Sequence, residues 1–584
     1  MRKFLVFLLV MLTAVSLVAQ TEYYVQDVSG GTKGGTLFLQ TTSGPRTYNY
    51  AWSQESSTSD ITAYFMESLM QTTNRGQWAE IGLAKEYWFE ENEMGGTSYY
   101  FRLREGVKWS DGTPFTVEDV MFSWENIWSI AEMTANGNDG YKTTNGNLPT
   151  ARLVDSNTIA FDYPEVFRNG FNYIGGAMQI YPKHVFQDRV KDADGNPDPE
   201  KFAQTWTLDQ IDQIVALGAF IPTSYQEGVR IVLERNPNFW HVDKDGVQLP
   251  YLDRVEYAII PDLNTGRLRF EAGQADLIAP TPENFPSLRA QADEKGWDTI
   301  IGGPVNSSQF IAFNFNAADP VKRQWFRDVN FRMAVAYAFD RDSVIDNIYQ
   351  GLGEAMYGPR SRSSAYYNAE IEKIGIRYSL IQARRTLQAG GYTWQGGKLH
   401  DSNGNKVTFT LITNAGNNVR EEIGNVLVDS LNRLGMEVIF RPVQFNALVA
   451  DLYTDKWDSL ILGLTGGDDP GFGTNTWTLD GGLHFWNWSP ERYDWVAEQN
   501  DYYVSDAERR IDEILRVSQS IIDPDELQKL WDEWQMLIVE NQILIHTVSQ
   551  NYLIVYNNKL NFANPAPNPL AGVLWRPAGI SKAQ

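Results

Sequence analysis

The sequence predicts an α/β protein built from about three domains. Its 584 residues correspond to about three domains at roughly 100–200 residues each. Segments with alternating apolar residues follow segments with helical spacing, and the strand–helix–strand order over 407–440 is typical of a parallel sheet covered by helices. The hydrophobic fraction of 43% and the charged fraction of 21% are ordinary for a folded protein, which excludes a wholly disordered chain.

The first nineteen residues are expected to form a targeting segment outside the fold. Arg2 and Lys3 precede an apolar run over 4–12, and small and apolar residues continue to Ala19. This pattern is typical of a secretory signal peptide, with cleavage predicted after Ala19. The run is shorter than the ~20 apolar residues of a membrane span, and no Cys follows that could carry a lipid. We therefore expect a soluble periplasmic or secreted protein without a lipid anchor.

The first half of the mature chain contains strand patterns and one strongly marked helix. Alternating apolar residues predict strands at 34–39 and 99–103. Thr116, with Asp119 three residues later, has the pattern of a capping box. Apolar residues then recur at helical spacing, which predicts a helix over 117–128 whose apolar face packs in a core.

The second half repeats this alternation of strands and helices. Turn-forming residues, mainly Gly and Pro, mark where the elements end. The expected elements are a helix over 331–349, a strand at 407–411, a helix over 423–434, a strand at 438–440, two helices within 506–540 separated at Asp523–Pro524, and a Pro-rich tail around 565–569 that packs on the first domain.

Composition and missing motifs exclude several classes of function. The net charge of −24 argues against nucleic acid or anionic lipid as a partner. The absence of Cys excludes disulfides, thiolate metal sites and cysteine nucleophiles. The chain has no Walker A loop, no GxSxG and no HExxH, so we expect neither an enzyme nor a cofactor. A pair among its 73 acidic residues could still serve a secreted glycoside hydrolase, which remains an alternative.

Three Asp- and Gly-containing segments, at 192–196, 243–246 and 401–405, have some similarity to calcium-binding loops. The first of them places Pro197 and Ala203 where an EF-hand needs Gly and a bidentate Glu. We interpret all three as Asx turns and expect no metal site.

The segment over 99–128, YYFRLREGVKWSDGTPFTVEDVMFSWENIW, resembles the signature of the family 5 extracellular solute-binding proteins, the oligopeptide- and dipeptide-binding type subunits of ABC importers. Further segments resemble motifs of the same family in the same order, so that the resemblance covers nearly all of the mature chain. They lie at 235–240, 251–253, 260–262, 272–276, 332–341, 389–392 and 468–470.

This resemblance implies a periplasmic-binding-protein fold, in which two α/β lobes face each other across a hinge and an extra domain is inserted. It also implies a protein without catalytic activity that works with an ABC transporter permease, and we expect a monomer. A peptide-binding chaperone or a signal receptor on the same fold is a further alternative. The implied divisions are domain I at 20–68, 190–310 and 545–584, domain II at 69–189, and domain III at 311–544.

The resemblance leaves two classes of ligand open. Peptide-binding members hold the α-amino group of the ligand with an acidic residue at the turn that matches Asp468 and Asp469. In this chain Leu464 replaces the Trp that usually precedes the glycine of this turn. An oligopeptide or dipeptide is therefore the alternative ligand.

Aromatic residues, 13% of the chain, favour a sugar. Sugars stack their flat faces on aromatic rings, and their hydroxyl groups need carboxylates and amides. Some family members bind β-linked oligosaccharides such as cello-oligosaccharides, and this chain resembles that subgroup. The alternative is that these Trp residues only pack the core. The predicted ligand-binding residues are Asp468, Asp469, Trp477, His484, Trp486, Asn487 and Trp488.

Overall fold

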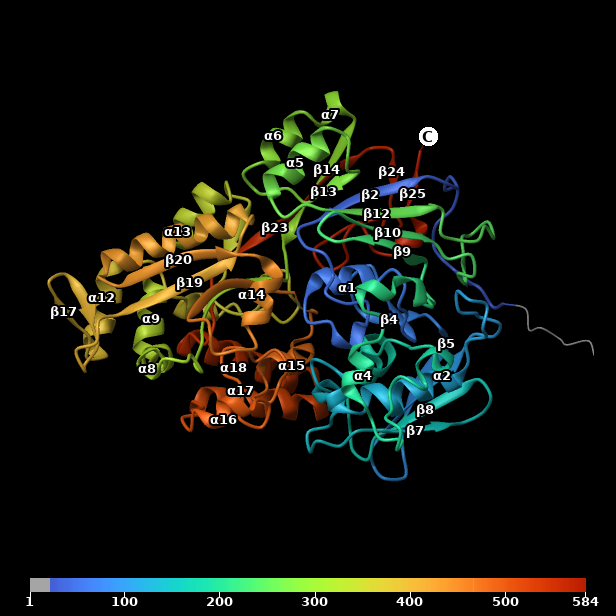
Figure 1. Cartoon of the computed structure of the whole chain (residues 1–584), viewed down its shortest axis with the longest axis horizontal. Helices are drawn as coiled ribbons and strands as arrows, with labels where there is room; N and C mark the ends of the chain where they lie inside the picture. The colour runs from blue at the N-terminus through green and yellow to red at the C-terminus, as the bar shows by residue number, and fades with distance from the viewer. Residues whose placement is uncertain (1–20, 466, 584) are drawn as a thin grey trace, which may run out of the picture.

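The computed structural model describes residues 21–465 and 467–583, so the predicted signal peptide lies outside the described residues. Figure 1 shows two bodies side by side: the yellow and orange segments of the chain form one, and the blue to green segments form most of the other. The red C-terminal strand β23 (Val548–Asn557) lies between them. Among the described residues, no helix is long and apolar enough to cross a membrane.

The first lobe contains a four-stranded sheet in the order β2 (Thr36–Thr41), β12 (Arg254–Ile259), β10 (Arg230–Arg235) and β9 (Phe220–Gln226). Strands β2 and β12 are parallel, although more than 200 residues separate them in the chain. Leu37 and Leu39 are buried while Phe38 is exposed, as the alternation in this segment predicts. The strand expected at 34–39 is therefore confirmed.

The segment with the family signature forms a second, antiparallel sheet. Its order is β5 (Ala84–Glu91), β6 (Thr97–Leu103), β8 (Thr158–Asp162) and β7 (Thr150–Leu153). The capping box predicted at Thr116 and Asp119 begins helix α2 (Val117–Ser123), which continues as a π-helical turn to Trp128. Trp109 and Val120 are buried, which confirms that much of the signature packs a core.

The second lobe contains a five-stranded sheet. Its order is β20 (Glu437–Val443), β19 (Thr408–Asn414), β21 (Ser459–Leu464), β15 (Ser308–Phe313) and β22 (Ile545–His546). Strands β19 and β20 are parallel, and helix α13 (Asn418–Arg433) joins them. The βαβ unit predicted over 407–440 is therefore confirmed.

The helix predicted over 331–349 is broken into two pieces. Helix α9 (Val329–Ala338) ends at Phe339, whose backbone is extended. Asp340 then caps a new helical segment, because its side chain accepts a hydrogen bond from the backbone N–H of Ser343. The side chain of Asp340 therefore starts a second helical segment within an apolar run whose spacing predicts a single helix. The pair of helices expected in 506–540 is confirmed as α17 (Asp506–Val517) and α18 (Pro524–Asn541).

The chain passes between the lobes twice, along adjacent paths. Strand β14 (Trp297–Pro304) of the first body leads into β15 of the second, and β22 of the second leads back into β23. The two paths are hydrogen-bonded to each other, because β14 pairs with β23 and β15 pairs with β22. These paired crossings lie where the fold class predicts the hinge.

The Pro-rich tail contacts more than the first domain. Ala578 accepts a hydrogen bond from the backbone of Tyr251 in the first lobe. Trp575 donates to Thr72 Oγ1 at 3.1 Å, and Arg576 forms an ion pair with Glu80. The last two partners lie in the segment expected to be domain II, so the tail joins both parts.

The remaining helices and strands are short. They are β1 (Tyr24–Val25), α1 (Ser56–Thr62), β3 (Met70–Thr72), β4 (Trp78–Ile81), α3 (Lys183–Phe186), α4 (Pro199–Ala203), β11 (His241–Val242), α5 (Leu263–Glu271), β13 (Leu277–Ile278), α6 (Phe285–Ala290), α7 (Ala292–Lys295), α8 (Pro320–Arg327), α10 (Arg341–Ser343), β16 (Gly353–Ala355), α11 (Ile371–Ile374), α12 (Leu380–Ala389), β17 (Thr393–Gln395), β18 (Lys398–His400), α14 (Phe445–Asp451), α15 (Thr474–Trp477), α16 (Asp494–Glu498), β24 (Leu560–Asn561) and β25 (Ser581–Lys582).

Candidate ligand-binding cleft

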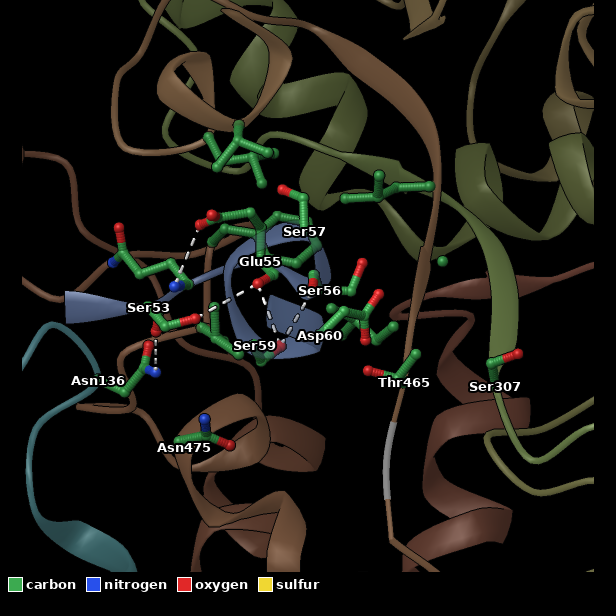
Figure 2. A pocket seen from close by; sticks show the side chains of 18 of the residues that line it. Ser53, Glu55, Ser56, Ser57, Ser59, Asp60, Asn136, Ser307, Thr465 and Asn475 are labelled. Atoms are coloured by element: carbon green, nitrogen blue, oxygen red, sulfur yellow. Dashed lines mark hydrogen bonds between the residues drawn. The ribbon is translucent and has the colours of Figure 1, made fainter. Parts of the chain in front are cut away.

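A cavity of about 630 Å³ lies between the two lobes. Its walls come from the end of β2 and helix α1, from the segment 128–177, and from the second lobe between 307 and 485. Figure 2 shows α1 on one side, with Ser307 and Thr465 of the second lobe beyond it. A cavity of this size between lobes is the usual setting for a small-molecule site.

The wall at α1 is rich in hydroxyl groups because the segment reads Ser-Ser-Thr-Ser-Asp. Thr58 and Ile61 face the core of the first lobe, while Ser56, Ser59 and Asp60 line the cavity. Ser59 Oγ donates to the carbonyl of Glu55 at 3.3 Å. Asp60 is accessible from the cavity, but the surrounding protein walls exclude much of the water, and this desolvation raises its pKa to about 6.

The opposite wall is built where β19 ends and α13 begins. Asn414 closes the strand, Asn417 caps the helix, and Arg420 lies in its first turn. Arg420 Nε donates to Gln309 Oε1 at 3.2 Å, and Nη1 donates to Asn414 Oδ1 at 2.8 Å. Burial lowers the pKa of Arg420 to about 10. Polar groups at the carboxyl end of parallel strands are the usual ligand contacts of α/β sheets.

Aromatic side chains also line the cavity. Tyr50 and Trp128 of the first lobe lie with ring centroids 6.2 Å apart. The rings of Phe472 in the second lobe and Tyr173 in the first lobe have their centroids 5.3 Å apart. Tyr50, Phe445 and Phe472 are partly exposed, so their rings remain available to a ligand.

The predicted tryptophan platforms lie elsewhere. Trp486 and Trp488 are 0% exposed, and neither lines the cavity. Trp488 donates to the carbonyl of Leu452 at 2.8 Å and stacks on Tyr453 with ring centroids 5.4 Å apart. Trp477 is 7% exposed and lines a smaller cavity of about 190 Å³. In this structure Trp486 and Trp488 pack the core of the second lobe, which favours the alternative that these residues only pack the core over the predicted stacking role.

His484 and Asn487 are also buried and hold a carboxylate within the second lobe. Asn487 Nδ2 donates to Glu508 Oε1 at 3.0 Å, and His484 Nε2 lies 3.8 Å from the same oxygen. Burial opposes ionisation of Glu508, but His484 and the hydrogen bonds with Ser505 lower its pKa to about 2. These residues therefore fix the start of α17, and in this arrangement they do not reach the main cavity.

The two predicted aspartates lie near the cavity but have partners within the protein. Asp469 accepts two hydrogen bonds from Arg168 of the first body, at 2.7 and 3.0 Å, and both side chains are 13% exposed. Asp468 Oδ1 accepts from Asn306 Nδ2 at 3.3 Å and from the backbone of Ala365 at 3.2 Å. Neither aspartate lines the main cavity.

Several cavity residues were missed by the sequence-based prediction. The Ser-rich segment 53–60 carries no helical apolar pattern. The run Asn-Ala-Gly-Asn-Asn-Val-Arg over 414–420, however, follows a predicted strand directly and opens a predicted helix. Polar residues at that junction are a signal that could have identified Asn414, Asn417 and Arg420.

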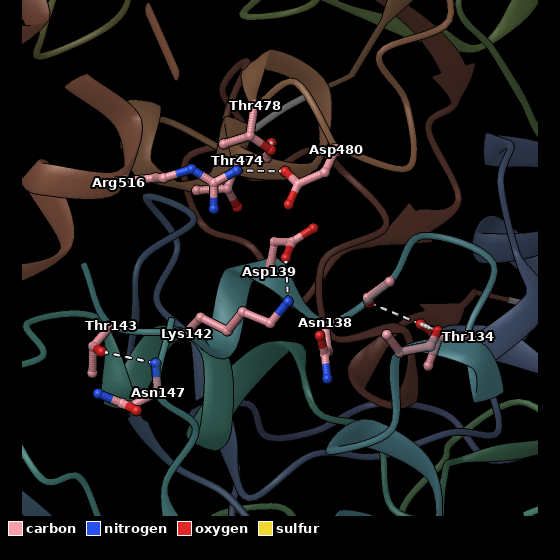
Figure 3. A network of polar contacts seen from close by, with 12 residues as sticks. Thr134, Asn138, Asp139, Lys142, Thr143, Asn147, Thr474, Thr478, Asp480 and Arg516 are labelled. Atoms are coloured by element: carbon pink, nitrogen blue, oxygen red, sulfur yellow. Dashed lines mark hydrogen bonds and ion pairs between the residues drawn. The ribbon is translucent and has the colours of Figure 1, made fainter. Parts of the chain in front are cut away.

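Polar contacts also join the bodies beside the cavity. Figure 3 shows Asp139 and Lys142 of the first body below Thr474, Asp480 and Arg516 of the second. Each ion pair lies within one body: Lys142 with Asp139 at 2.6 Å, and Arg516 with Asp480 at 2.5 Å. The bonds that cross between the bodies run from Thr144 Oγ1 to the carbonyl of Arg516 at 3.0 Å and from Arg492 to the carbonyl of Ala135 at 2.7 Å. Burial and the nearby Asp480 carboxylate raise the pKa of Asp139. In this structure the lobes thus touch each other along one side of the cavity.

The three segments interpreted as Asx turns have that geometry. Asp192 Oδ1 accepts from the backbone N–H of Asp194 at 2.9 Å and from that of Asn196 at 2.8 Å. Asp243 and Asp401 accept the equivalent pairs of bonds. Within 21–465 and 467–583, no group of three or more His, Asp or Glu side chains is arranged to hold a metal ion.

Comparisons with known proteins agree on one family. The family model for bacterial extracellular solute-binding proteins, family 5, matches residues 79–484. A probable ABC transporter-binding protein of Deinococcus radiodurans is 32% identical over 391 residues, which cover 63% of this chain and 64% of that protein. The oligopeptide-binding protein AppA of Bacillus subtilis is 26% identical over 87% of this chain and 85% of its own length. The periplasmic alpha-galactoside-binding protein of Rhizobium meliloti is 27% identical over 65% and 56%, respectively.

Two solved structures have the same fold. AppA of Bacillus subtilis in complex with a nonapeptide superimposes with a TM-score of 0.78 and 21% identity, over 95% of this chain and 100% of that chain. The periplasmic binding protein MelB of Agrobacterium fabrum, in complex with stachyose, superimposes with a TM-score of 0.80 and 22% identity, over 96% of this chain and 86% of that chain. The mixed α/β fold is therefore that of the periplasmic binding proteins. Because the family model covers more than half of its length, the chain belongs to the bacterial extracellular solute-binding proteins of family 5.

Proposed function

We propose that this protein is the extracytoplasmic solute-binding subunit of an ABC importer. It captures a β-linked oligosaccharide in the cleft between its lobes and delivers it to the membrane permease. The family match, the relatives named as oligopeptide-binding and alpha-galactoside-binding proteins, and the cavity between the lobes support this role. We further propose a monomer without catalytic activity, whose ligand stabilises the closed form through contacts absent from the open form.

The hydrogen-bond partners of Asp468 and Asp469 are the observation that favours a sugar over a peptide as the ligand. A peptide ammonium needs a free carboxylate, because a buried cation without a partner is costly. Asp469 is already neutralised by Arg168, and Asp468 accepts bonds from Asn306 and a backbone N–H. The cavity itself presents hydroxyl and amide groups, which suit the hydroxyl groups of a sugar.

Partly exposed aromatic rings support the same ligand class. We assign the stacking role, first predicted for the Trp cluster, to Tyr50, Phe445 and Phe472, which line the cavity from both lobes. Trp477 stays a candidate only for the smaller neighbouring cavity.

An oligopeptide is the second candidate, because acidic groups do line the cavity. Asp60 and Glu55 of the first lobe could accept a ligand ammonium in place of Asp468 and Asp469. AppA, which binds oligopeptides by name, has the same fold over nearly the whole of this chain.

Calorimetry distinguishes the two candidates. The panel is cello-, manno- and laminari-oligosaccharides against dipeptides to pentapeptides and a nonapeptide. We expect micromolar or tighter binding of at least one β-linked oligosaccharide and no binding of peptides. Peptide binding without sugar binding would replace the proposed ligand and leave the importer role intact. Hydrolysis of a bound oligosaccharide, followed by chromatography, would instead indicate an enzyme.

The processing and the domain divisions remain proposals as well. We propose that the mature protein begins near Gln20 and is exported to the periplasm without a lipid anchor, which N-terminal sequencing of the exported protein tests. We propose domain I at 20–68, 190–310 and 545–584, domain II at 69–189 and domain III at 311–544. The paired crossings near 304–308 and 546–548 lie within a few residues of two of these proposed boundaries.

A further inference from the structure

Arg420 is a cavity-lining cation that forms no ion pair within the described residues. Two other arginines beside the cleft are matched by acids: Arg168 pairs with Asp469, and Arg516 pairs with Asp480. Arg420 instead meets two neutral acceptors, Gln309 Oε1 and Asn414 Oδ1. All three of these side chains line the 630 Å³ cavity.

The hydrogen bonds fix the guanidinium and leave part of it unused. A guanidinium carries five N–H donors in a planar fork. Nε and one N–H of Nη1 are occupied by Gln309 and Asn414, while Nη2 makes no hydrogen bond to the described residues. The edge formed by Nη1 and Nη2 therefore retains donors in the geometry that binds a carboxylate through two oxygens.

The electrostatic setting favours an anion at this place. Arg420 stays protonated at neutral pH although burial lowers its pKa to about 10. A partly buried cation without a counter-charge is unfavourable, and an anion brought by the ligand would remove that cost. The N-terminus of α13, to which Arg420 belongs, adds partial positive charge. The acidic side chains of the cavity, Glu55, Asp60 and Asp139, belong to the first body instead.

We infer that the ligand carries a carboxylate and that Arg420 binds it. This inference rests on the proposed function, and it narrows the substrate class to acidic oligosaccharides with an aldonic or uronic acid unit. A peptide with a free C-terminal carboxylate offers the same chemistry, so the test includes both sources.

The test compares matched ligands on matched variants. Neutral cello-oligosaccharides are compared with their reducing-end aldonic acids, and peptides with their C-terminal amides. The proteins are the wild type, Arg420→Gln, Arg420→Lys and Arg433→Gln. Arg433 is the control, because it lies on the same helix but pairs only loosely with Asp429 at the surface. Thermal unfolding without ligand checks that each variant is folded.

For the wild type we expect the aldonic acid to bind at least tenfold tighter than the neutral sugar. Arg420→Gln should abolish this preference, because it should weaken binding of the aldonic acid at least tenfold more than it weakens binding of the neutral sugar. Arg420→Lys should retain part of it, and Arg433→Gln should behave as the wild type. Equal affinities for both sugars, or an equal loss of both in Arg420→Gln, would overturn the inference.

Two further experiments distinguish a failure of this inference from a failure of the proposed function. In the first outcome, the wild type binds peptides but not sugars, and C-terminal amidation of the peptide lowers its affinity for the wild type but not for Arg420→Gln. This result would refute the sugar ligand and retain Arg420 as the carboxylate site. D-glucuronate alone, at millimolar concentration, should raise the melting temperature of the wild type more than D-glucose does, but not that of Arg420→Gln. The absence of this difference contradicts the carboxylate site whatever the longer ligand is.

Discussion

His546 couples the stability of the second lobe to pH. Its side chain lies in β22 and is buried, and its backbone carbonyl accepts hydrogen bonds from Arg341. Burial, together with the positive charges of Arg341 and Arg360, lowers the pKa of His546 to about 3. In an unfolded chain a His titrates near 6.5. The unfolded state therefore binds one more proton between these values, and the folded state loses stability as the pH falls through this window.

Replacing His546 by Gln should remove that component. Wild type is expected to lose about 1.4 kcal/mol of unfolding free energy per pH unit from this residue between about 6.5 and 3. The stability difference between pH 7 and pH 5 should therefore be about 2 kcal/mol smaller in His546→Gln. Urea unfolding at both pH values measures it, with His400→Gln on the β17–β18 hairpin as control. Parallel pH profiles of wild type and His546→Gln would contradict the assignment.

Aromatic residues of the core and of the cavity should respond differently to truncation. Trp486→Ala opens a void in the second lobe and should cost about 3–5 kcal/mol of stability. Tyr50→Ala removes a partly exposed ring from the cavity, and the lost burial of about 1–3 kcal/mol on ligand binding corresponds to a roughly 5- to 150-fold loss of affinity. Differential scanning fluorimetry and calorimetry measure the two effects. A Trp486→Ala variant that melts like the wild type but loses the ligand would restore the original interpretation of this residue.

At the scale of elements, local patterns predicted strands β2, β6, β19 and β20 and helices α2, α13, α17 and α18, but not the many short elements. The βαβ unit around α13 and the capping box of α2 follow from hydrophobic spacing and end signals, which depend on neighbouring residues alone. The cavity could not be predicted in this way. The local sequence around Trp486 and Trp488 is equally compatible with a turn-rich segment that folds into the core and with one that faces a ligand. The break at Asp340 was missed because Asp within an apolar run fits an exposed helical position as well as a cap.

The capping box of α2 offers a graded test at this scale. Thr116 Oγ1 accepts from the backbone N–H of Glu118 at 3.2 Å, so Thr116→Ala should cost about 1 kcal/mol. Asp119 is buried and accepts from the backbone of both Thr116 and Lys183, at 2.9 and 3.0 Å. Asp119→Ala leaves two donors unsatisfied and should cost about 2–4 kcal/mol, judged at about 1–2 kcal/mol for each. Chemical denaturation of both variants measures the difference, and an equal cost would show that the link to Lys183 is unimportant.

At the scale of the whole molecule, the Arg168–Asp469 pair joins the two bodies next to the cavity. Its two hydrogen bonds cross from the first body to the second, and Arg168 Nε also donates to the carbonyl of Ser518 at 2.9 Å. Tyr173 adds a bond from its hydroxyl to the carbonyl of Gly471 at 2.7 Å. These contacts exist only while the lobes are together, so they stabilise the closed form at the expense of the open form.

Breaking this pair should open the free protein. Asp469→Asn and Arg168→Gln are each expected to increase the radius of gyration in small-angle X-ray scattering. Each should also weaken ligand binding about 3- to 10-fold, since a partly buried ion pair contributes about 1 kcal/mol. The double variant should be no worse than either single variant, because both remove the same interaction. Lys373→Gln, in a surface pair with Glu370, is the control. Scattering curves that superimpose on the wild type would exclude a role for this pair in closure.

The paired crossings between the lobes limit how the molecule can move. Two hydrogen-bonded strands placed side by side resist stretching and lateral sliding, but they bend out of their common plane with little resistance. A rigid body attached through such a joint keeps about one rotational degree of freedom and loses the others. The search for the closed arrangement is then a motion along a single angle, and the entropy that capture must overcome is that of one angle. A flexible tether would instead leave each lobe free to translate and tumble, and the same cleft would have to overcome a much larger loss of freedom.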